Sequence, residues 1–503
     1  MLAGVASAVL GAGLGELAAA IVAPSSGPVA VVGSALVDLA PPWAKDTAIA
    51  LFGTADKVAL VIGITLVLLA AAAGAGVLEA RLAPWGRVAL VALGGAGVVA
   101  AVSRADAGSF AALPSLIAGV AAAIVLDRLL RLLRHPARRT AEQSPPADGA
   151  GLDRRRFLTW TGVTVAAGVL ATIGSQVART SARAVDALRA AIRLPQPQAT
   201  ASLPAGSDLA IDGLAPVITP NDAFYRIDTA IVVPQIDPAD WSLRIHGLVE
   251  REVVLSWQDV LALPMSESTT TLACVSNEVG GDLIGNAVWL GHPVRELLAK
   301  AGPTADADMV LSRSIDGFTA STPLEALTDD RNAILAIGMN GEPLPIPHGF
   351  PARLVVPGLY GYVSATKWVT ELEVTRFDRA RGYWTDRGWS ARGPIKLESR
   401  IDVPRGSVAA GDTVIAGVAW QQHVGVAGVE VQIDDGPWRA ATLAPAISDD
   451  TWVQWSLPWT AEAGDHRLRC RATSATGEVQ TEQTAPPAPD GATGWHTVAV
   501  LVS

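Results

Sequence analysis

Cys274 lies where a short apolar and β-branched run, residues 269–273, opens into a polar segment that contains Gly280 and Gly281. A cysteine at the end of a strand, before a glycine-containing loop, can present its sulfur as a nucleophile or as a metal ligand. The plain alternative is a small buried apolar residue. The other cysteine, Cys470, sits in an alternating pattern that is typical of the inward face of a strand, so we interpret it as a core residue.

The segment from 348 to 358 carries a second group that is suited to chemistry. Arg353 enters a Leu-Val-Val run there, and a guanidinium that a strand half buries needs an anion. A guanidinium binds an oxyanion through two parallel hydrogen bonds, and backbone N–H groups in the turn at residues 361–367 could surround the remaining oxygens. The sequence therefore predicts an anion site. A surface position for Arg353 is the alternative.

These two segments together resemble the molybdenum–pterin domain of the sulfite oxidase family. In that family a lone cysteine in a Cys-x-x-Asn setting, which is Cys274 to Asn277 here, gives its thiolate to molybdenum. The Ile-Thr-Pro-Asn-x-x-Phe motif at residues 218–224 and the His-Gly-x-Pro-x-Arg run at 348–353 are shared as well. The resemblance covers about residues 214–503. It implies a molybdenum–molybdopterin cofactor with Cys274 as the metal ligand.

The resemblance also implies roles for individual residues. The implied cofactor-binding residues are Tyr225, Arg226, Cys274, His348, Arg353, Ser364, Thr366 and Lys367. The implied catalytic positions are Cys274, Arg226 and Phe318.

Three departures from the family pattern bear on the substrate. Sulfite-oxidising members have an Arg-Asn-His run where this chain has Arg226, Ile227 and Asp228, and a tyrosine where it has Phe318. They also carry arginines four and five residues after the cysteine, where Glu278 and a valine stand here. A carboxylate opposes a dianion by ~1 kcal/mol or more at surface-like dielectric. We therefore expect two-electron oxo transfer on a small uncharged substrate, such as a sulfoxide, and not on sulfite.

The elements expected to position these residues are those of an α+β domain over residues 214–398. Strands are expected at 241–247 and 253–256, followed by a short helix that Ser256 caps. After the cysteine segment we expect a strand from 310, a loop at 314–318, a helix capped near residues 322–323 and a strand at 333–339. Asn340 and Gly341 form a hairpin turn signal.

Residues 399–503 read as an all-β domain. Short alternating runs recur every 8–15 residues between turn signals such as Asp434-Asp435-Gly436, which favours an immunoglobulin-like β-sandwich. The segments at 417–420 and 430–436 resemble the family's C-terminal dimerisation domain. The resemblance thus implies a homodimer.

The first 180 residues have the composition of a transmembrane helical bundle. Half of the whole chain is hydrophobic and 17% is charged, which is too apolar for an ordinary soluble protein. We expect about five membrane spans, near residues 3–23, 58–78, 87–103, 112–130 and 157–177. All seven histidines lie outside them, so intramembrane haem with two histidine ligands is not expected, and no charged relay is evident in the spans.

Basic residues predict the orientation of these spans. Arginines cluster between the fourth and fifth spans, for example Arg128, Arg131, Arg155 and Arg156, and basic loops stay in the cytoplasm. The chain after a connector at residues 181–213 is then extracytoplasmic. Residues 153–158, Asp-Arg-Arg-Arg-Phe-Leu, read either as an internal twin-arginine export signal or as a positive-inside anchor.

The expected partners follow from these features. A net charge of −10 and the lack of a recognisable motif argue against nucleic acid. No haem-binding segment is recognisable in the sequence, so electrons are expected to pass to or from a separate electron-transfer protein or a membrane quinone.

A metal-free, anchored β-rich binding or scaffold protein is the alternative function. A cysteine hydrolase with His292 or His348 as base is a third, although no oxyanion-hole motif surrounds Cys274.

Overall fold

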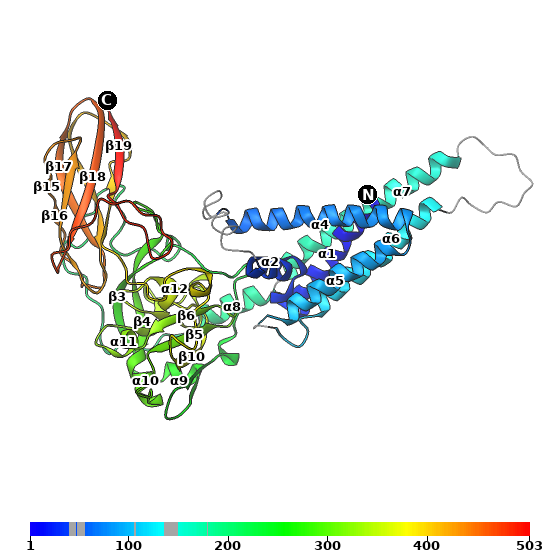
Figure 1. Ribbon diagram of the computed structural model, residues 1–503, viewed down its shortest axis with the longest axis horizontal. Helices are drawn as coiled ribbons and strands as arrows, with labels where there is room; N and C mark the ends of the chain where they lie inside the picture. The colour runs from blue at the N-terminus through cyan, green and yellow to red at the C-terminus, as the bar shows by residue number, and fades with distance from the viewer. Residues whose placement is uncertain (40–46, 48–55, 105–106, 135–148, 179) are drawn as a thin grey trace, which may run out of the picture. The chain divides into compact units, whose positions relative to one another are not determined.

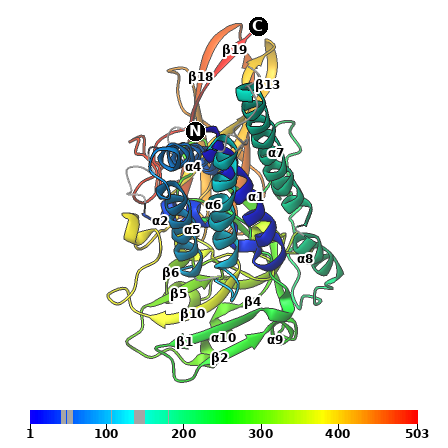
Figure 2. The ribbon, with the colours of Figure 1, turned by 90° about the vertical axis from the view of Figure 1, so that its right-hand side faces the viewer.

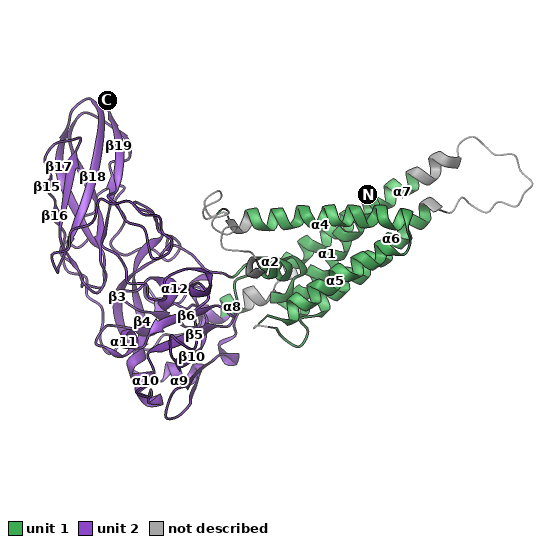
Figure 3. Cartoon of the chain, viewed as in Figure 1, with its two compact units in different colours: residues 1–187, 230–235 green, residues 188–229, 236–503 purple. Residues whose placement is uncertain are grey.

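The computed structural model describes residues 1–39, 47, 56–104, 107–134, 149–178 and 180–503 (Figure 1). The chain divides into two compact units, which Figure 3 distinguishes by colour. The first unit comprises residues 1–187 with 230–235, and the second comprises residues 188–229 with 236–503.

The first unit is helical. Its helices are α1 (Leu2–Val22), α2 (Pro28–Leu39), α4 (Asp56–Arg81), α5 (Trp85–Val102), α6 (Leu113–Arg134), α7 (Gly149–Ala178) and the start of α8 (Thr180–Ala191). Helix α1 packs against both α6 and α7, and α5 packs against α6 (Figure 2). Five stretches are long and apolar enough to cross a membrane, namely Leu2–Val22, Ala59–Arg81, Trp85–Val102, Leu113–Leu132 and Arg155–Gln176. These are the five runs that the sequence predicts.

Charged groups link three of these helices. The backbone N–H of Arg87 donates to the Glu79 carboxylate at 3.0 Å, and its guanidinium donates to Asp127 at 2.9 Å. Glu79 is 1% exposed. These charged residues form an ion-paired group where α4, α5 and α6 meet, which the sequence did not predict.

The first part of the second unit contains two β-sheets and several short helices. One sheet has the strand order β2-β1-β10-β5-β6, and the other has the order β3-β4-β7-β8 with β9 paired to β7. The strands are β1 (Ser242–Gly247), β2 (Val253–Ser256), β3 (Ser266–Ala273), β4 (Ile284–Pro293), β5 (Met309–Ser314), β6 (Thr319–Pro323), β7 (Ile334–Met339), β8 (Glu342–Pro343), β9 (Arg353–Val355) and β10 (Val369–Thr375). The short helices are α9 (Trp257–Leu261), α10 (Val294–Ala301), α11 (Glu325–Thr328) and α12 (Gly361–Ser364).

Local sequence signals explain several of these boundaries. Ser256 caps α9 in a capping box with Asp259, as the sequence predicts. Asn340 and Gly341 both adopt positive φ, at 50° and 83°, and turn β7 into β8. The helix expected to be capped near residues 322–323 is wrongly placed. Those residues continue β6, which pairs with β5 along its whole length, and α11 starts at Glu325.

Residues 398–503 fold into two facing sheets with the orders β11-β13-β17-β16 and β12-β19-β18-β14-β15. The strands are β11 (Glu398–Val403), β12 (Gly406–Val408), β13 (Gly411–Trp420), β14 (Val426–Ile433), β15 (Arg439–Ala440), β16 (Thr442–Leu443), β17 (Val453–Ala461), β18 (Gly464–Ser474) and β19 (Thr497–Val502). Both sheets contribute to one apolar core, in which Trp455, Leu468 and Cys470 are fully buried. The predicted core position of Cys470 is confirmed.

The sandwich fixes the edge strand that leads to Cys274. Thr271 of β3 donates its N–H to the Asp450 carbonyl at 3.0 Å, and its hydroxyl accepts from the Trp452 N–H at 2.8 Å. Gln422 donates to the Thr271 carbonyl at 3.2 Å. The backbone N–H and carbonyl of Thr271, which have no strand partner, are therefore bonded to the sandwich, which holds this end of the strand in place.

Candidate functional site

Cys274 follows β3 directly, as predicted, and is a free cysteine that is 9% exposed. Its N–H donates to the Leu283 carbonyl at 2.9 Å, and its Sγ accepts from the Ser276 N–H at 3.4 Å. Asn277 closes the loop, because its side-chain oxygen accepts from the Leu283 N–H at 2.8 Å. Burial raises the pKa of the Cys274 thiol, and the Ser276 hydrogen bonds oppose this. A thiolate at this position needs a nearby positive charge.

Tyr225 lies within electrostatic range of both Cys274 and Arg353. Burial raises the pKa of the Tyr225 phenol, the charge of Cys274 raises it further, and Arg353 lowers it. Tyr225 therefore connects the loop that carries Cys274 with the segment that carries Arg353. Tyr225 also stacks on Phe224, with ring centroids 5.2 Å apart.

Arg353 is a buried cation without a recorded carboxylate partner among the described residues. It is 5% exposed, and its guanidinium donates to the carbonyls of His348 (3.1 Å), Ala365 (3.4 Å) and Leu354 (3.3 Å). It lies 5.1 Å from the centre of the Trp289 ring. Burial lowers its pKa to about 10. A buried guanidinium that only carbonyls and a ring solvate is suited to an external anion.

His348 and Lys367 lie beside Arg353. His348 is 6% exposed, and its Nε2 is 3.2 Å from the Asn221 carbonyl, which assigns the ring proton to Nε2. Burial, with Arg353 and Lys367, lowers the pKa of His348 to about 4, so the ring is neutral at pH 7. Burial lowers the pKa of Lys367 to about 8, against the opposite effect of Asp228.

Asp228 joins two of the predicted cofactor residues. Its carboxylate accepts from Lys367 Nζ at 2.6 Å and from Arg226 Nε at 2.8 Å, and its side chain is 4% exposed. The sequence analysis noted Asp228 only as a departure from the family pattern and did not predict this bridge. Its spacing of two residues from Arg226 was the available signal.

Ser364 and Thr366 are fully buried, but their hydroxyls bond within the protein. The Ser364 hydroxyl donates to the Tyr360 carbonyl at 3.0 Å, and that of Thr366 pairs with Ser312 at 2.7 Å. Both hydroxyls therefore hold the turn at residues 361–367 in shape. Any contribution of this turn to an anion site is then expected from its backbone N–H groups.

Phe318 stands apart from this group. It ends the turn between β5 and β6, and its ring lies 5.8 Å from that of Tyr383. Tyr383 contacts Trp384, Trp384 contacts Trp389, and Trp389 contacts Tyr362, with centroids 5.2 to 6.2 Å apart. Within the described part of the chain, no recorded hydrogen bond, ion pair or ring contact joins Phe318 to Cys274 or Arg353.

Glu278, which the sequence suggested would repel an anionic substrate, is exposed to solvent. Water screens a charge in such a position, so its influence on the buried group is weak. The charge of Glu278 is therefore a poor argument about the substrate.

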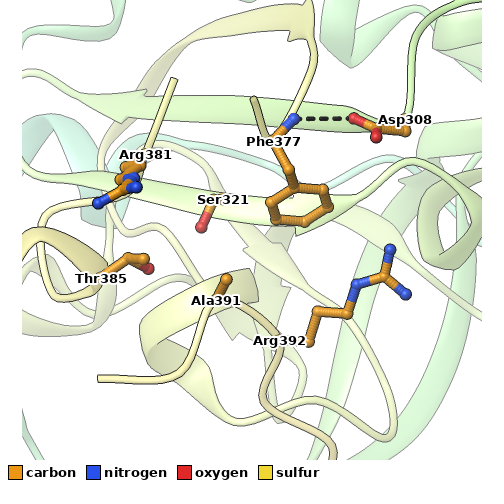
Figure 4. A pocket seen from close by; sticks show the side chains of 7 residues that line it. All are labelled: Asp308, Ser321, Phe377, Arg381, Thr385, Ala391 and Arg392. Atoms are coloured by element: carbon orange, nitrogen blue, oxygen red, sulfur yellow. Dashed lines mark hydrogen bonds between the residues drawn. The ribbon is translucent and has the colours of Figure 1, made fainter. Parts of the chain in front are cut away.

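A surface hollow of about 380 Å³ is lined by a residue just before β5, a residue of β6 and residues of the segment after β10 (Figure 4). Its lining residues are Asp308, Ser321, Phe377, Arg381, Thr385, Ala391 and Arg392. None of the predicted cofactor residues lines it, so this hollow is separate from the group around Cys274.

Glu398 is a buried carboxyl that the sequence analysis missed. It is 4% exposed, and burial raises its pKa to about 8, against the effects of Lys396 and of the Asn277 amide. It therefore stands beneath the loop that carries Cys274. Nothing in its sequence neighbourhood distinguishes it from an ordinary strand residue, because the burial comes from packing of the sandwich on that loop.

Comparisons with known proteins agree with this geometry. A family model described as an oxidoreductase molybdopterin binding domain matches residues 230–384. An uncharacterized oxidoreductase of Bacillus subtilis, YuiH, is 36% identical over 171 residues, which are 34% of this chain and 83% of that protein. Chicken sulfite oxidase is 27% identical over 54% of this chain and 69% of its own length. Human mitochondrial sulfite oxidase is 29% identical over 57% of this chain and 62% of its own length.

A solved structure shares the fold. The sulfane dehydrogenase SoxCD from Paracoccus pantotrophus aligns with a TM-score of 0.51 and 23% sequence identity, over 62% of this chain and 90% of that one.

Proposed function

The chain belongs to the sulfite oxidase family of molybdopterin oxidoreductases, and from this we propose that it is a membrane-anchored enzyme that carries out two-electron oxo transfer on a small substrate other than sulfite. The observation that carries the proposal is a buried thiol and a buried guanidinium, both within electrostatic range of Tyr225, with no carboxylate partner for the guanidinium among the described residues. A buried guanidinium without a counter-ion is costly, and a cofactor would give Arg353 a phosphate and Cys274 a metal.

The residues of the site fit the molybdenum–molybdopterin cofactor. Cys274 would hold the metal through its thiolate, and Arg353 and Lys367 would hold the phosphate. Tyr225 and the neutral ring of His348 would line the pterin side. When bound, the cofactor supplies oxo-group transfer coupled to the movement of two electrons.

The protein itself excludes water from Cys274 and Arg353 and holds charged and hydrogen-bonding groups in fixed positions around them. Cys274 and Arg353 are 9% and 5% exposed, so water is largely excluded from them. Low local polarity strengthens the attraction between Arg353 and a phosphate. The Ser276 N–H, 3.4 Å from the sulfur, stabilises the thiolate form that a metal requires.

The helical unit supports an anchored arrangement. Five helices of spanning length and the basic residues between the last two favour a multi-pass protein whose second unit is extracytoplasmic. Electrons would then pass to or from a separate protein or a membrane quinone. The sandwich is proposed to be immunoglobulin-like and to join two copies into a homodimer.

Elemental and pterin analysis of the purified full-length protein tests the proposal. We expect about one molybdenum and one pterin per chain, and an electronic spectrum that changes in Cys274→Ser but not in Cys470→Ser. Both variants remove one buried thiol, so the second controls for the loss of a cysteine as such. Folded, exported protein with neither molybdenum nor pterin would overturn the proposal and favour a metal-free scaffold.

A further inference from the structure

Asp228 is held between two cations of the proposed cofactor site. Its Oδ2 lies 2.6 Å from Lys367 Nζ and 2.8 Å from Arg226 Nε, and its Oδ1 lies 3.4 Å from Arg226 Nη2. The Arg226 guanidinium therefore turns two of its nitrogens toward one carboxylate. Since the Asp228 side chain is only 4% exposed, water screens these contacts little.

The charged side chains of the site sum to a positive charge that one bound phosphate group would neutralise. Three cations, Arg226, Arg353 and Lys367, stand against the one carboxylate of Asp228, which gives a net charge of about plus two for this group. His348 adds nothing, because its pKa of about 4 keeps it neutral. A monophosphate carries roughly two negative charges at neutral pH. Once the cofactor phosphate is bound, no net positive charge remains for a dianionic substrate.

Arg226 is the most solvent-exposed of these three cations. Its side chain is 37% exposed, compared with 10% for that of Lys367. If it were unpaired, it would attract anions from solution. Asp228 instead occupies Nε and the adjacent nitrogen, which is the edge of the guanidinium that grips oxyanions in two-point contacts.

We propose that Asp228 is a specificity-determining residue, which cancels the charge of Arg226 and so makes the site select uncharged substrates over sulfite-like dianions. The inference rests on the proposed function, because it assumes that the cofactor phosphate occupies Arg353 and Lys367. It does not depend on Glu278, whose charge faces solvent.

The test compares Asp228→Asn with the wild type as full-length, cofactor-loaded protein. Sulfate is the probe, because it is a dianion of sulfite-like shape that the enzyme does not turn over. We expect sulfate to bind at least tenfold more tightly to Asp228→Asn at low ionic strength, as measured by calorimetric titration. Molybdenum and pterin content are measured on the same samples.

Asp378→Asn is the matched control. Asp378 also follows its arginine by two residues and accepts from Arg376 Nε at 2.9 Å and Nη2 at 2.7 Å, but it lies outside the cofactor group. This variant should bind sulfate as the wild type does. Asp228→His is a second variant in case the amide disturbs the fold, since an imidazole also removes the negative charge of the carboxylate. It should also bind sulfate more tightly.

The outcomes separate the inference from the function on which it rests. Unchanged sulfate affinity in both Asp228 variants, with full molybdenum content, would overturn the role of Asp228 and leave the proposed function standing. A tenfold gain that Arg226→Ala abolishes in the Asp228→Asn background would support it. Wild-type protein without molybdenum would instead overturn the proposed function, and the inference with it.

Discussion

The two cysteines of this chain offer a comparison between its two β regions. Both are free and buried, at 9% exposed for Cys274 and 0% for Cys470. Burial raises the pKa of both thiols, that of Cys470 to about 12. By burial alone, Cys470 is the more extreme residue. These two properties therefore do not identify a metal ligand.

The surroundings of the two sulfurs are what differ. Cys470 stands mid-strand in the apolar core of the sandwich, where it accepts from the Ser399 hydroxyl at 3.3 Å. The nearby Arg400 is itself neutralised by Asp402, at 2.7 Å. Cys274 instead stands at a strand end, and Tyr225 lies within electrostatic range of both its sulfur and Arg353, a buried cation with no carboxylate partner among the described residues. An uncompensated buried cation in the same neighbourhood, and not burial of the thiol itself, therefore marks the site.

The largest expected effect comes from removing that charge. Arg353→Gln should lower the molybdenum and pterin content at least tenfold, because a charge-assisted phosphate contact contributes on the order of 1.5–3 kcal/mol. The melting temperature of cofactor-free protein should stay unchanged or rise, since a buried cation without a counter-ion is lost. Metal analysis and thermal melting of the same preparations check both parts.

Arg400→Gln is the control for this prediction. Arg400 is also buried, at 5% exposed, but it is paired with Asp402 and donates to the Gly281 carbonyl at 2.8 Å. Its loss leaves a buried carboxylate with a weaker partner and should destabilise the fold by about 3 kcal/mol. If both variants lose stability alike and Arg353→Gln keeps its cofactor, the contrast between the two regions is wrong.

Glu398 lies where the two regions meet and should make stability depend on pH. Its folded pKa is raised from the ordinary 4.5 to about 8, so the folded state holds a proton that the unfolded state has released. The free energy of unfolding should therefore fall as pH rises from about 4.5 toward 8, by on the order of 3 kcal/mol at pH 7. Glu398→Gln stays neutral and should remove this loss.

Thermal melting between pH 5 and pH 8 measures the effect of Glu398. The melting temperature should fall less steeply with rising pH in Glu398→Gln than in the wild type. Glu278→Gln, which changes an exposed carboxylate of the neighbouring loop, should leave the slope as it is. Equal slopes in all three proteins would show that Glu398 is solvated and not held neutral.

Local patterns made much of the site predictable from the sequence. Cys274 ends a strand, Arg353 begins one, and Ser256 caps a helix, as their immediate neighbours indicate. Each of these features depends on a few consecutive residues, whose periodicity and turn chemistry decide the outcome. The five apolar helices were predictable for the same reason.

Features that depend on distant partners were not predictable. The contact between Asp228 and Lys367 joins residues 139 positions apart, and no local pattern reports it. The inward hydroxyls of Ser364 and Thr366, which bond within the protein, likewise depend on packing. The start of α11 was misplaced because pairing with β5 extends the edge strand up to Pro323, the proline that had suggested a helix start.

The smallest expected effect concerns the two thiols as packing groups. Cys470→Ala should destabilise the protein by about 1–2 kcal/mol, because it leaves a cavity in a core that Trp455 and Leu468 fill completely. Cys274→Ala in cofactor-free protein should cost less than about 1 kcal/mol, since the loop after β3 is partly exposed and can relax. Thermal melting of cofactor-free samples measures the stability lost in each variant. Metal analysis of loaded samples should rank them the other way, with Cys274→Ala losing molybdenum and Cys470→Ala keeping it. A Cys274→Ala variant that loses more stability than Cys470→Ala without the cofactor would make Cys274 a structural residue, and the comparison would then lose its basis.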